Sequence, residues 1–138
     1  MADTIRFELV SPERLLMSED VAQVDVPGAE GDFGVLPQHV PAIATLRAGI
    51  LAVRGTDNAK REVFVRGGFA DVRPDMITVL AEQAIPVEEI DEAVLAQEIQ
   101  NAEEDVADAR DELAREKAQR HLDRLQEVIA ALKAAGHG

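Results

Sequence analysis

The sequence of 138 residues contains no cysteine, no tryptophan and no tyrosine. The absence of cysteine excludes disulfides and thiol catalysis, and with only three histidines there is no Cys/His cluster that could bind zinc. No apolar run approaches the ~20 residues that a membrane-spanning helix requires. The first residues also lack the basic and apolar segments of a secretory signal. These absences predict a soluble protein that is cytoplasmic by default and needs no metal or other cofactor.

Basic residues are in the minority: 14 Lys and Arg stand against 27 Asp and Glu, which gives a net charge of −13 at pH 7. This charge argues against direct binding to nucleic acid or to an anionic membrane surface. Four phenylalanines are the only aromatic residues, so platforms for base stacking are scarce as well. A partner protein with a basic surface suits the charge better, although the same acidity would also serve simply to keep the chain soluble.

The composition changes sharply near Pro86. All six prolines, all four phenylalanines and seven of the nine glycines lie at or before this residue. Residues 49–54 and 61–66 flank a segment rich in turn-forming residues and predict a hairpin. Gly67-Gly68 separates the second of these strands from another at 69–72. Strands that recur about every 8–12 residues predict an all-β sandwich or barrel, and the spacing does not choose between the two.

The rest of the chain predicts helix, because residues 87–135 contain neither proline nor glycine. Asp91 is placed to cap the first turn, and Gly136 is placed to end the last. The apolar residues recur at helical spacing in two runs: Leu95, Ile99, Ala102, Val106, Ala109 and Leu113, then Ala118, Leu122, Leu125, Ile129 and Leu132. The step of five residues between the runs rotates the apolar stripe by roughly 140°.

The charges divide at about the same place. Residues 88–112 carry eleven acidic side chains and one basic one, whereas residues 113–138 carry five basic and three acidic ones. This division favours an antiparallel helical hairpin, with its turn between Ala107 and Arg115, over one rod with two solvated faces. The stripes are rich in alanine and bury little apolar area, so we expect a lightly held hairpin that can detach and bind another protein.

The stretch EGDFGVLPQHVP, residues 30–41, is the first candidate for a functional site. Its glycines lack the spacing of phosphate-binding loops. His39 could act as a base oriented by Asp32 or Glu30, which would make the protein a small enzyme, but no serine or cysteine nucleophile lies nearby. We therefore expect a stiff loop that displays Glu30 and Asp32 for contact rather than for chemistry.

Four stretches together point to a known family. They are FELVSPERLL near the start, VPGAEGDFGVLPQHVPAIATLRAGIL in the middle, then FVRGGFADV, and AEQAIPVEEID at the junction. With these stretches the chain, from about residue 4 to 135, resembles the epsilon subunit of bacterial F-type ATP synthase, the equivalent of the mitochondrial delta subunit. The resemblance implies a ten-stranded β-sandwich of two five-stranded sheets over residues 1–87. It also implies a C-terminal antiparallel helical hairpin over residues 88–138.

The same resemblance implies a function. It predicts a non-catalytic subunit of the central rotor stalk, which links the gamma subunit to the membrane c-ring during proton-driven ATP synthesis. The expected location is peripheral, at the cytoplasmic face of the bacterial inner membrane. By matching positions, Glu30 and Asp32 are expected to contact the c-ring, and His39 is expected to contact the gamma subunit.

The C-terminal helices carry a further expectation. In members of the family they can rise along gamma into the catalytic head of alpha and beta subunits, where basic residues meet an acidic segment of beta and block ATP hydrolysis. On grounds of charge, the residues expected to make this inhibitory contact are Arg115, Arg120 and Arg124.

An alternative role is that of an ATP-sensing regulatory subunit. Some bacterial members bind ATP at the base of the hairpin through a short sequence motif. The motif consists of Ile or Leu, then Asp, any two residues, Arg and Ala. Ile90 and Asp91 match this pattern, but Val94 stands where the arginine belongs. Without a guanidinium group a phosphate loses its fork of hydrogen-bond donors, so the sequence predicts no nucleotide-binding site here.

Overall fold

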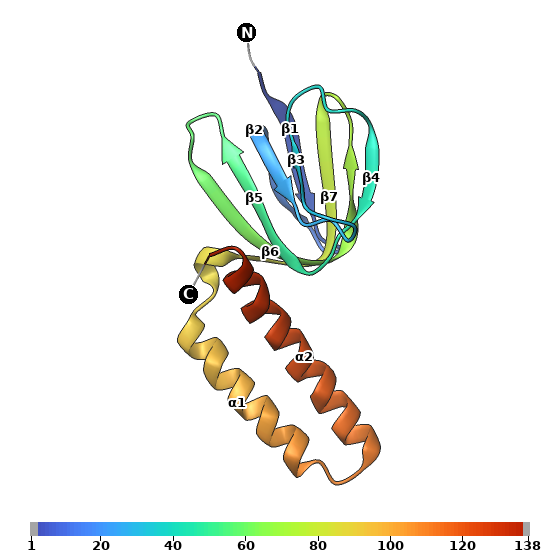
Figure 1. Ribbon diagram of the computed structural model, residues 1–138, viewed down its shortest axis with the longest axis vertical. Helices are drawn as coiled ribbons and strands as arrows, with labels where there is room; N and C mark the ends of the chain where they lie inside the picture. The colour runs from blue at the N-terminus through green and yellow to red at the C-terminus, as the bar shows by residue number, and fades with distance from the viewer. Residues whose placement is uncertain (1–2, 137–138) are drawn as a thin grey trace. The chain divides into compact units, whose positions relative to one another are not determined.

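Seven strands form the first part of the chain in the computed structural model, which describes residues 3–136 (Figure 1). In chain order they are β1 (Ile5–Val10), β2 (Leu15–Val26), β3 (Phe33–Val35), β4 (Ala42–Thr45), β5 (Gly49–Gly55), β6 (Lys60–Val72) and β7 (Met76–Pro86). β1 pairs with β7 in parallel orientation and with β2 in antiparallel orientation. β7, β6, β5 and β2 lie in this order, and each is paired antiparallel with the next. These five strands close into a ring, to which β3 and β4 are added at β2 and β6.

The predicted β-sandwich followed by a helical hairpin is confirmed, but the strands number seven rather than ten within the described residues, and they form one continuous sheet. The reason is that single long strands have different partners along their length. The first half of β6 pairs with β5, and its second half pairs with β4. The expected break at Gly67-Gly68 is therefore wrong: the residues on both sides belong to one strand, which bends there. The two predicted alternatives, sandwich and barrel, do not exclude each other here, because the five paired strands also close into a ring.

The bend in β6 requires glycine at position 68. Gly67 and Gly68 both have positive φ, +70° and +100°, a backbone conformation that side chains with a Cβ rarely adopt. A Cβ built on Gly68 would lie 1.7 Å from the carbonyl oxygen of Leu80 on the neighbouring strand. A Cβ on Gly67 would instead meet the flexible side chain of Glu82. The sheet can pass through this point only because residue 68 has no side chain.

The core of the sheet consists of inward-facing residues from alternate positions of its strands. Phe7 and its partner Ile77 are both fully buried, and so are Val24 and its partner Val53. Along β1 the burial alternates, because Ile5, Phe7 and Leu9 are buried while Arg6 is exposed. Each fully buried side chain of this size contributes roughly 1.5–3 kcal/mol through the hydrophobic effect. The core therefore holds the ring of strands closed from within.

Two helices, α1 (Glu92–Asp108) and α2 (Glu112–Ala134), follow a short 3-10 turn at Val87–Glu89. The expected caps are present. The Asp91 carboxylate accepts hydrogen bonds from Ala93 N–H at 2.9 Å and Val94 N–H at 3.2 Å. Gly136, at φ +88°, follows the last residue of α2 by two positions. The hairpin turn falls at residues 109–111, inside the predicted interval, where Asp111 caps α2 by accepting from Ala114 N–H at 2.7 Å.

The two helices pack against each other, and the apolar stripe divides between them. Leu95 and Ala102 of α1 are buried, as are Leu122 and Leu132 of α2. Leu113 was expected to continue the first run, but its side chain is 68% exposed. It lies beyond the turn, as the second residue of α2, so it no longer shares a face with the α1 stripe. The first run therefore ends at the turn.

The chain divides into two compact units between Val87 and Glu88. The first contains the seven strands and the second the two helices. Among the described residues, neither helix combines the length and the apolar character that crossing a bilayer would demand. The two units are thus built on different principles: a closed hydrogen-bonded sheet around an aliphatic core, and a pair of helices with a narrow apolar seam.

We expect Gly68→Ala to lower the free energy of unfolding by about 3 kcal/mol or more, since overpacking costs about 1–3 kcal/mol and left-handed backbone about 1–2 kcal/mol. Gly67→Ala is the matched control and should cost about 1–2 kcal/mol, because the Glu82 side chain can move away. Urea unfolding followed by far-ultraviolet circular dichroism measures both, since the protein has no tryptophan or tyrosine to report by fluorescence. Equal losses in the two variants would contradict the assignment of the bend to Gly68.

Candidate functional site

The loop between β2 and β3 lies against the segment that joins β4 to β5. The contacts between them are a Gly28–Leu46 bridge, a 2.8 Å hydrogen bond from Ala29 N–H to the Thr45 carbonyl, and a 3.0 Å hydrogen bond from Arg47 N–H to the Pro27 carbonyl. Backbone bonds of this kind fix the path of a loop without depending on its side chains. The start of the loop is therefore held in register with the next part of the sheet.

The glycines of the loop serve a close approach of backbone to backbone. Gly31 N–H donates to the Gly28 carbonyl at 3.2 Å, and a Cβ on Gly28 would lie 2.5 Å from the Gly31 carbonyl oxygen. Gly31 itself has φ +141°. This tight turn explains the glycines without a phosphate ligand, in agreement with the expected stiff loop.

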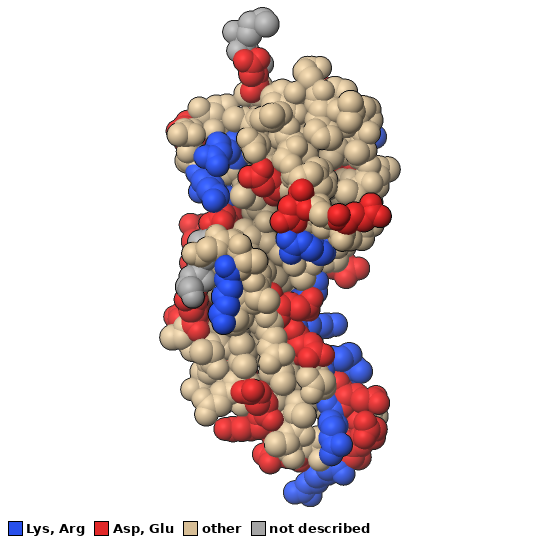
Figure 2. All heavy atoms as spheres, viewed as in Figure 1, with Lys and Arg blue, Asp and Glu red and all other residues tan. Residues whose placement is uncertain are grey.

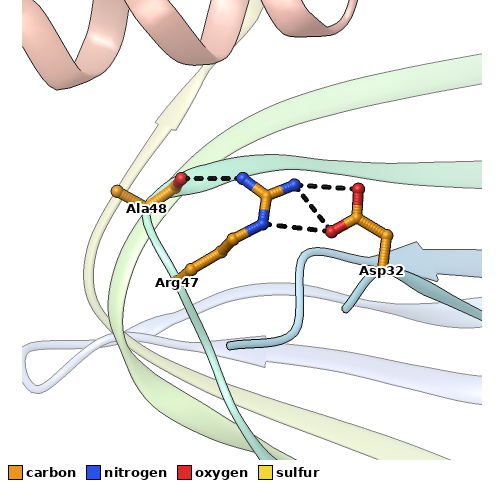
Figure 3. A network of polar contacts seen from close by, with 3 residues as sticks. All are labelled: Asp32, Arg47 and Ala48. Atoms are coloured by element: carbon orange, nitrogen blue, oxygen red, sulfur yellow. Dashed lines mark hydrogen bonds and ion pairs between the residues drawn. The ribbon is translucent and has the colours of Figure 1, made fainter. Parts of the chain in front are cut away.

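Asp32 is paired with Arg47, which lies 15 residues further along the chain (Figure 3). Arg47 Nε donates to Asp32 Oδ1 at 3.1 Å, and Nη2 donates to Oδ1 at 2.6 Å and to Oδ2 at 2.8 Å. Nη1 donates to the Ala48 carbonyl at 3.2 Å. The two side chains are 65% and 42% exposed, so the pair contributes at most about 1 kcal/mol to folding. The pair links the loop to the segment that joins β4 to β5.

Sequence reasoning missed Arg47. A signal was present, because it is the only Lys or Arg between Arg14 and Arg54. The expectation that Asp32 is turned outward holds for its exposure, but its charge is already matched within the chain. Glu30 differs: it is exposed, and its carboxylate makes no hydrogen bond or ion pair within residues 3–136.

His39 lies in a tight turn between β3 and β4. Its Nδ1 is 2.7 Å from the Val40 carbonyl oxygen, and its ring centroid is 6.4 Å from that of Phe33. Gln38, at φ +69°, donates its backbone N–H to the Pro74 carbonyl at 2.7 Å. The Nδ1 contact is with a backbone carbonyl rather than with a carboxylate, so the pairing of base and orienting acid that an enzyme would need is not formed here.

A groove of about 650 Å³ lies beside the loop. Residues 28–33 line one side of it and residues 43–45 the other. Ile43 on its edge is 75% exposed, and Leu36 and Val40 in the neighbouring turn are 54% and 71% exposed. Large apolar side chains at this level of exposure are typical of a surface that meets another protein.

A second apolar surface runs across the outside of the sheet. Pairing places four residues side by side in one row, each on a different strand: Leu15, Val10, Leu80 and Phe69. Directly paired residues point to the same face of a sheet. Leu15, Leu80 and Phe69 are 55%, 39% and 41% exposed. We call these four residues the apolar row. The sequence alone did not reveal it, because its members come together only through the register of four strands.

The three arginines expected to act in inhibition are all exposed on α2, but they do not form one group. Arg120 and Arg124 are one turn apart and share a face, whereas Arg115 is five residues before Arg120 and points about 140° away. Arg115 Nη1 lies 3.9 Å from Glu112. Figure 2 shows basic side chains next to acidic ones along the hairpin, so the basic surface is interrupted by acids.

The stretch expected to bind ATP in related proteins has another use here. The Asp91 carboxylate already accepts two backbone hydrogen bonds as the cap of α1. Ile90 precedes it, and the side chain of Val94 is 51% exposed and offers no donor. A phosphate at this helix start would find no guanidinium to bind it.

Residues 4–87 match the family model described as the ATP synthase delta/epsilon chain, beta-sandwich domain. The ATP synthase epsilon chain of Mesorhizobium japonicum is 46% identical over 132 residues, which cover 96% of this chain and 98% of that protein. The epsilon chain of Paramagnetospirillum magneticum is 47% identical over 135 residues, with 98% of both chains covered.

Two solved structures are also similar. A chain in the cryo-EM structure of the Euglena gracilis mitochondrial ATP synthase, an OSCP/F1/c-ring assembly, is 29% identical and superposes with a TM-score of 0.76, over 96% of this chain and 83% of that one. A chain of the central stalk and c-ring of the Tetrahymena thermophila mitochondrial enzyme is 14% identical, with a TM-score of 0.58 over 95% of both chains, and shows the same fold. The family match over the whole sheet and the identity over nearly the full length show that this chain belongs to the delta/epsilon chain family of ATP synthases.

Proposed function

We propose that this chain acts as a non-catalytic subunit of the central stalk of an F-type ATP synthase, linking the gamma subunit to the c-ring during proton-driven ATP synthesis. The observation that carries the proposal is the similarity of both units together, 46% identity over 96% of the chain, to proteins described as ATP synthase epsilon chains. The likeness to a chain of an F1/c-ring assembly supports the same place in the complex. The protein has no catalytic role of its own in this proposal.

The loop at residues 28–32 is the proposed contact with the c-ring. It carries Glu30 and Asp32, its start is held by backbone bonds, and a groove with an apolar edge lies beside it. A rigid acidic loop suits a partner with basic groups, because little conformational freedom is lost when the contact forms. This contact would transmit rotation from the ring to the stalk, and a flexible loop would serve that task poorly.

The proposed contact with the gamma subunit combines His39 with the exposed apolar residues near it and the apolar row. Leu36 and Val40 flank His39, and both are more than half exposed. Burial of such side chains at about 25 cal/mol per Å² supplies a stable association that does not depend on charge. The chain would then be held to gamma by apolar area and would meet the ring through a charged loop.

The helical hairpin is the proposed regulatory part. Its seam buries only a few large side chains, so it can open at modest cost and place α2 against the beta and alpha subunits. Arg120 and Arg124 share a face that fits an acidic partner segment, and Arg115 would meet it separately. The whole chain would lie at the cytoplasmic face of the bacterial inner membrane, as a peripheral part of the complex.

Truncation after Glu89 tests the division of labour. We expect the remaining sheet to stay folded, with a cooperative unfolding transition, and to bind gamma, because its core is built from its own strands. The assembled enzyme should keep proton-driven synthesis and hydrolyse ATP faster, since α2 is gone. The matched variant is the full chain with Arg120→Gln and Arg124→Gln, which keeps α2 but lacks the two arginines of the proposed inhibitory contact. Aggregation of the truncated chain would overturn its independence, and an unchanged ATPase rate would overturn inhibition while leaving the stalk role standing.

ATP sensing is the second candidate function, and Val94, which stands where the arginine belongs, speaks against it. Calorimetric titration of the full chain with ATP should show no binding tighter than about 1 mM, which corresponds to about −4 kcal/mol. Val94→Arg is the matched variant: residue 94 is exposed enough to accept the longer side chain, and its guanidinium should strengthen binding. Submillimolar binding by the unaltered chain would restore the regulatory alternative.

A further inference from the structure

The two acidic residues of the loop at residues 28–32, which we call the contact loop, have different surroundings. Asp32 accepts three hydrogen bonds from the Arg47 guanidinium, and both of its oxygens take part (Figure 3). Glu30, two residues earlier, is exposed and has no hydrogen bond or ion pair in the part of the chain that the structure describes. A partner that carries positive charge would meet an unmatched carboxylate at Glu30 and a neutral pair at Asp32.

Arg47 bonds to both ends of the turn that carries Glu30. Its backbone N–H donates to the Pro27 carbonyl at 3.0 Å, before the turn, and its side chain binds Asp32, after it. The remaining guanidinium nitrogen, Nη1, donates to the Ala48 carbonyl at 3.2 Å. A single residue therefore closes residues 27–32 into a short loop of defined length.

The backbone leaves room for this arrangement at Gly49. A Cβ there would lie 2.9 Å from Arg47 Nη1 and 2.8 Å from Pro27 Cβ. Either distance is too short for a real side chain, so residue 49 must lack one for the guanidinium and Pro27 to keep their places. The position of Arg47 is thus set by the backbone around it as well as by its hydrogen bonds.

We propose that Arg47 is a positioning residue, which acts through Asp32 to hold Glu30 as the single carboxylate that a basic group of the c-ring recognises. The proposal rests on the proposed function of this loop and divides the work within it. Asp32 shapes the loop, and Glu30 makes the contact. A lysine at position 47 could not replace arginine, because an ammonium group lacks the planar fork that binds both carboxylate oxygens and the Ala48 carbonyl at once.

Exchange of the two charged partners tests the proposal in the full chain. The variants are Asp32→Arg, Arg47→Asp, the double variant with both changes, and Glu30→Gln. The first readout is the position of the Gly31 amide in the ¹⁵N–¹H NMR spectrum of the isolated protein. The second is the rate of proton-driven ATP synthesis after assembly with the other subunits. Circular dichroism confirms that each variant folds.

We expect each single change at 32 or 47 to move the Gly31 resonance and to slow synthesis by about threefold, the size of effect that an exposed charge pair gives. The double variant, which restores an opposite-charge pair, should return both readouts toward those of the unaltered protein. Glu30→Gln should slow synthesis by a similar factor. The loop residues away from position 30 should keep their amide resonances in this variant. Arg47→Lys should behave like a single change.

Two results would overturn the proposal separately from the proposed function. If the double variant regains the Gly31 resonance but stays as slow as Asp32→Arg, then Asp32 contacts the partner directly. If Gly31 does not move in any single variant, the pair does not hold the loop. If the resonances behave as expected but neither Glu30→Gln nor the single changes affect synthesis, the loop is held as described and its role toward the c-ring is wrong.

Discussion

The closure of the sheet by β1 is the constraint on which the rest of the structure depends. This strand pairs with β2 on one side and with β7 on the other, and so joins the two ends of the order β7, β6, β5, β2. Closure removes free edges from these five strands, and an unpaired edge is where sheets associate wrongly. It also fixes the register of every neighbouring strand, because a slip of one residue would turn the core side chains outward.

Both candidate surfaces follow from that register. The apolar row exists because four strands bring Leu15, Val10, Leu80 and Phe69 to the same level. The contact loop exists because Pro27 and Arg47, far apart in sequence, are brought within one hydrogen bond of each other. Contact residues on a rigid scaffold keep their geometry under load, whereas contact residues on a free loop would not. A subunit that transmits rotation needs that rigidity.

The sequence predicted local features well and non-local ones poorly. Asp91, Gly136 and the interval of the hairpin turn were correct, because caps and turns depend on a few adjacent residues. The unbroken path of β6 was missed, since Gly67-Gly68 marks a turn in most contexts and only the neighbouring strand shows that it is a bend. The Asp32–Arg47 pair and the apolar row were missed for the same reason. Both depend on which strands meet, and periodicity carries no information about that.

The central claim is that one loop of the sheet meets the c-ring while another face of the same sheet holds gamma. The chain has no cysteine, so Glu30→Cys introduces a single thiol into the contact loop, and Leu80→Cys introduces one into the apolar row as the matched control. Each variant, labelled with a short photoactivatable crosslinker and assembled into the complex, identifies the subunit that lies beside it. The account predicts that position 30 crosslinks to the c subunit and position 80 to gamma. Crosslinking of position 30 to gamma, or of both positions to the same subunit, would contradict it.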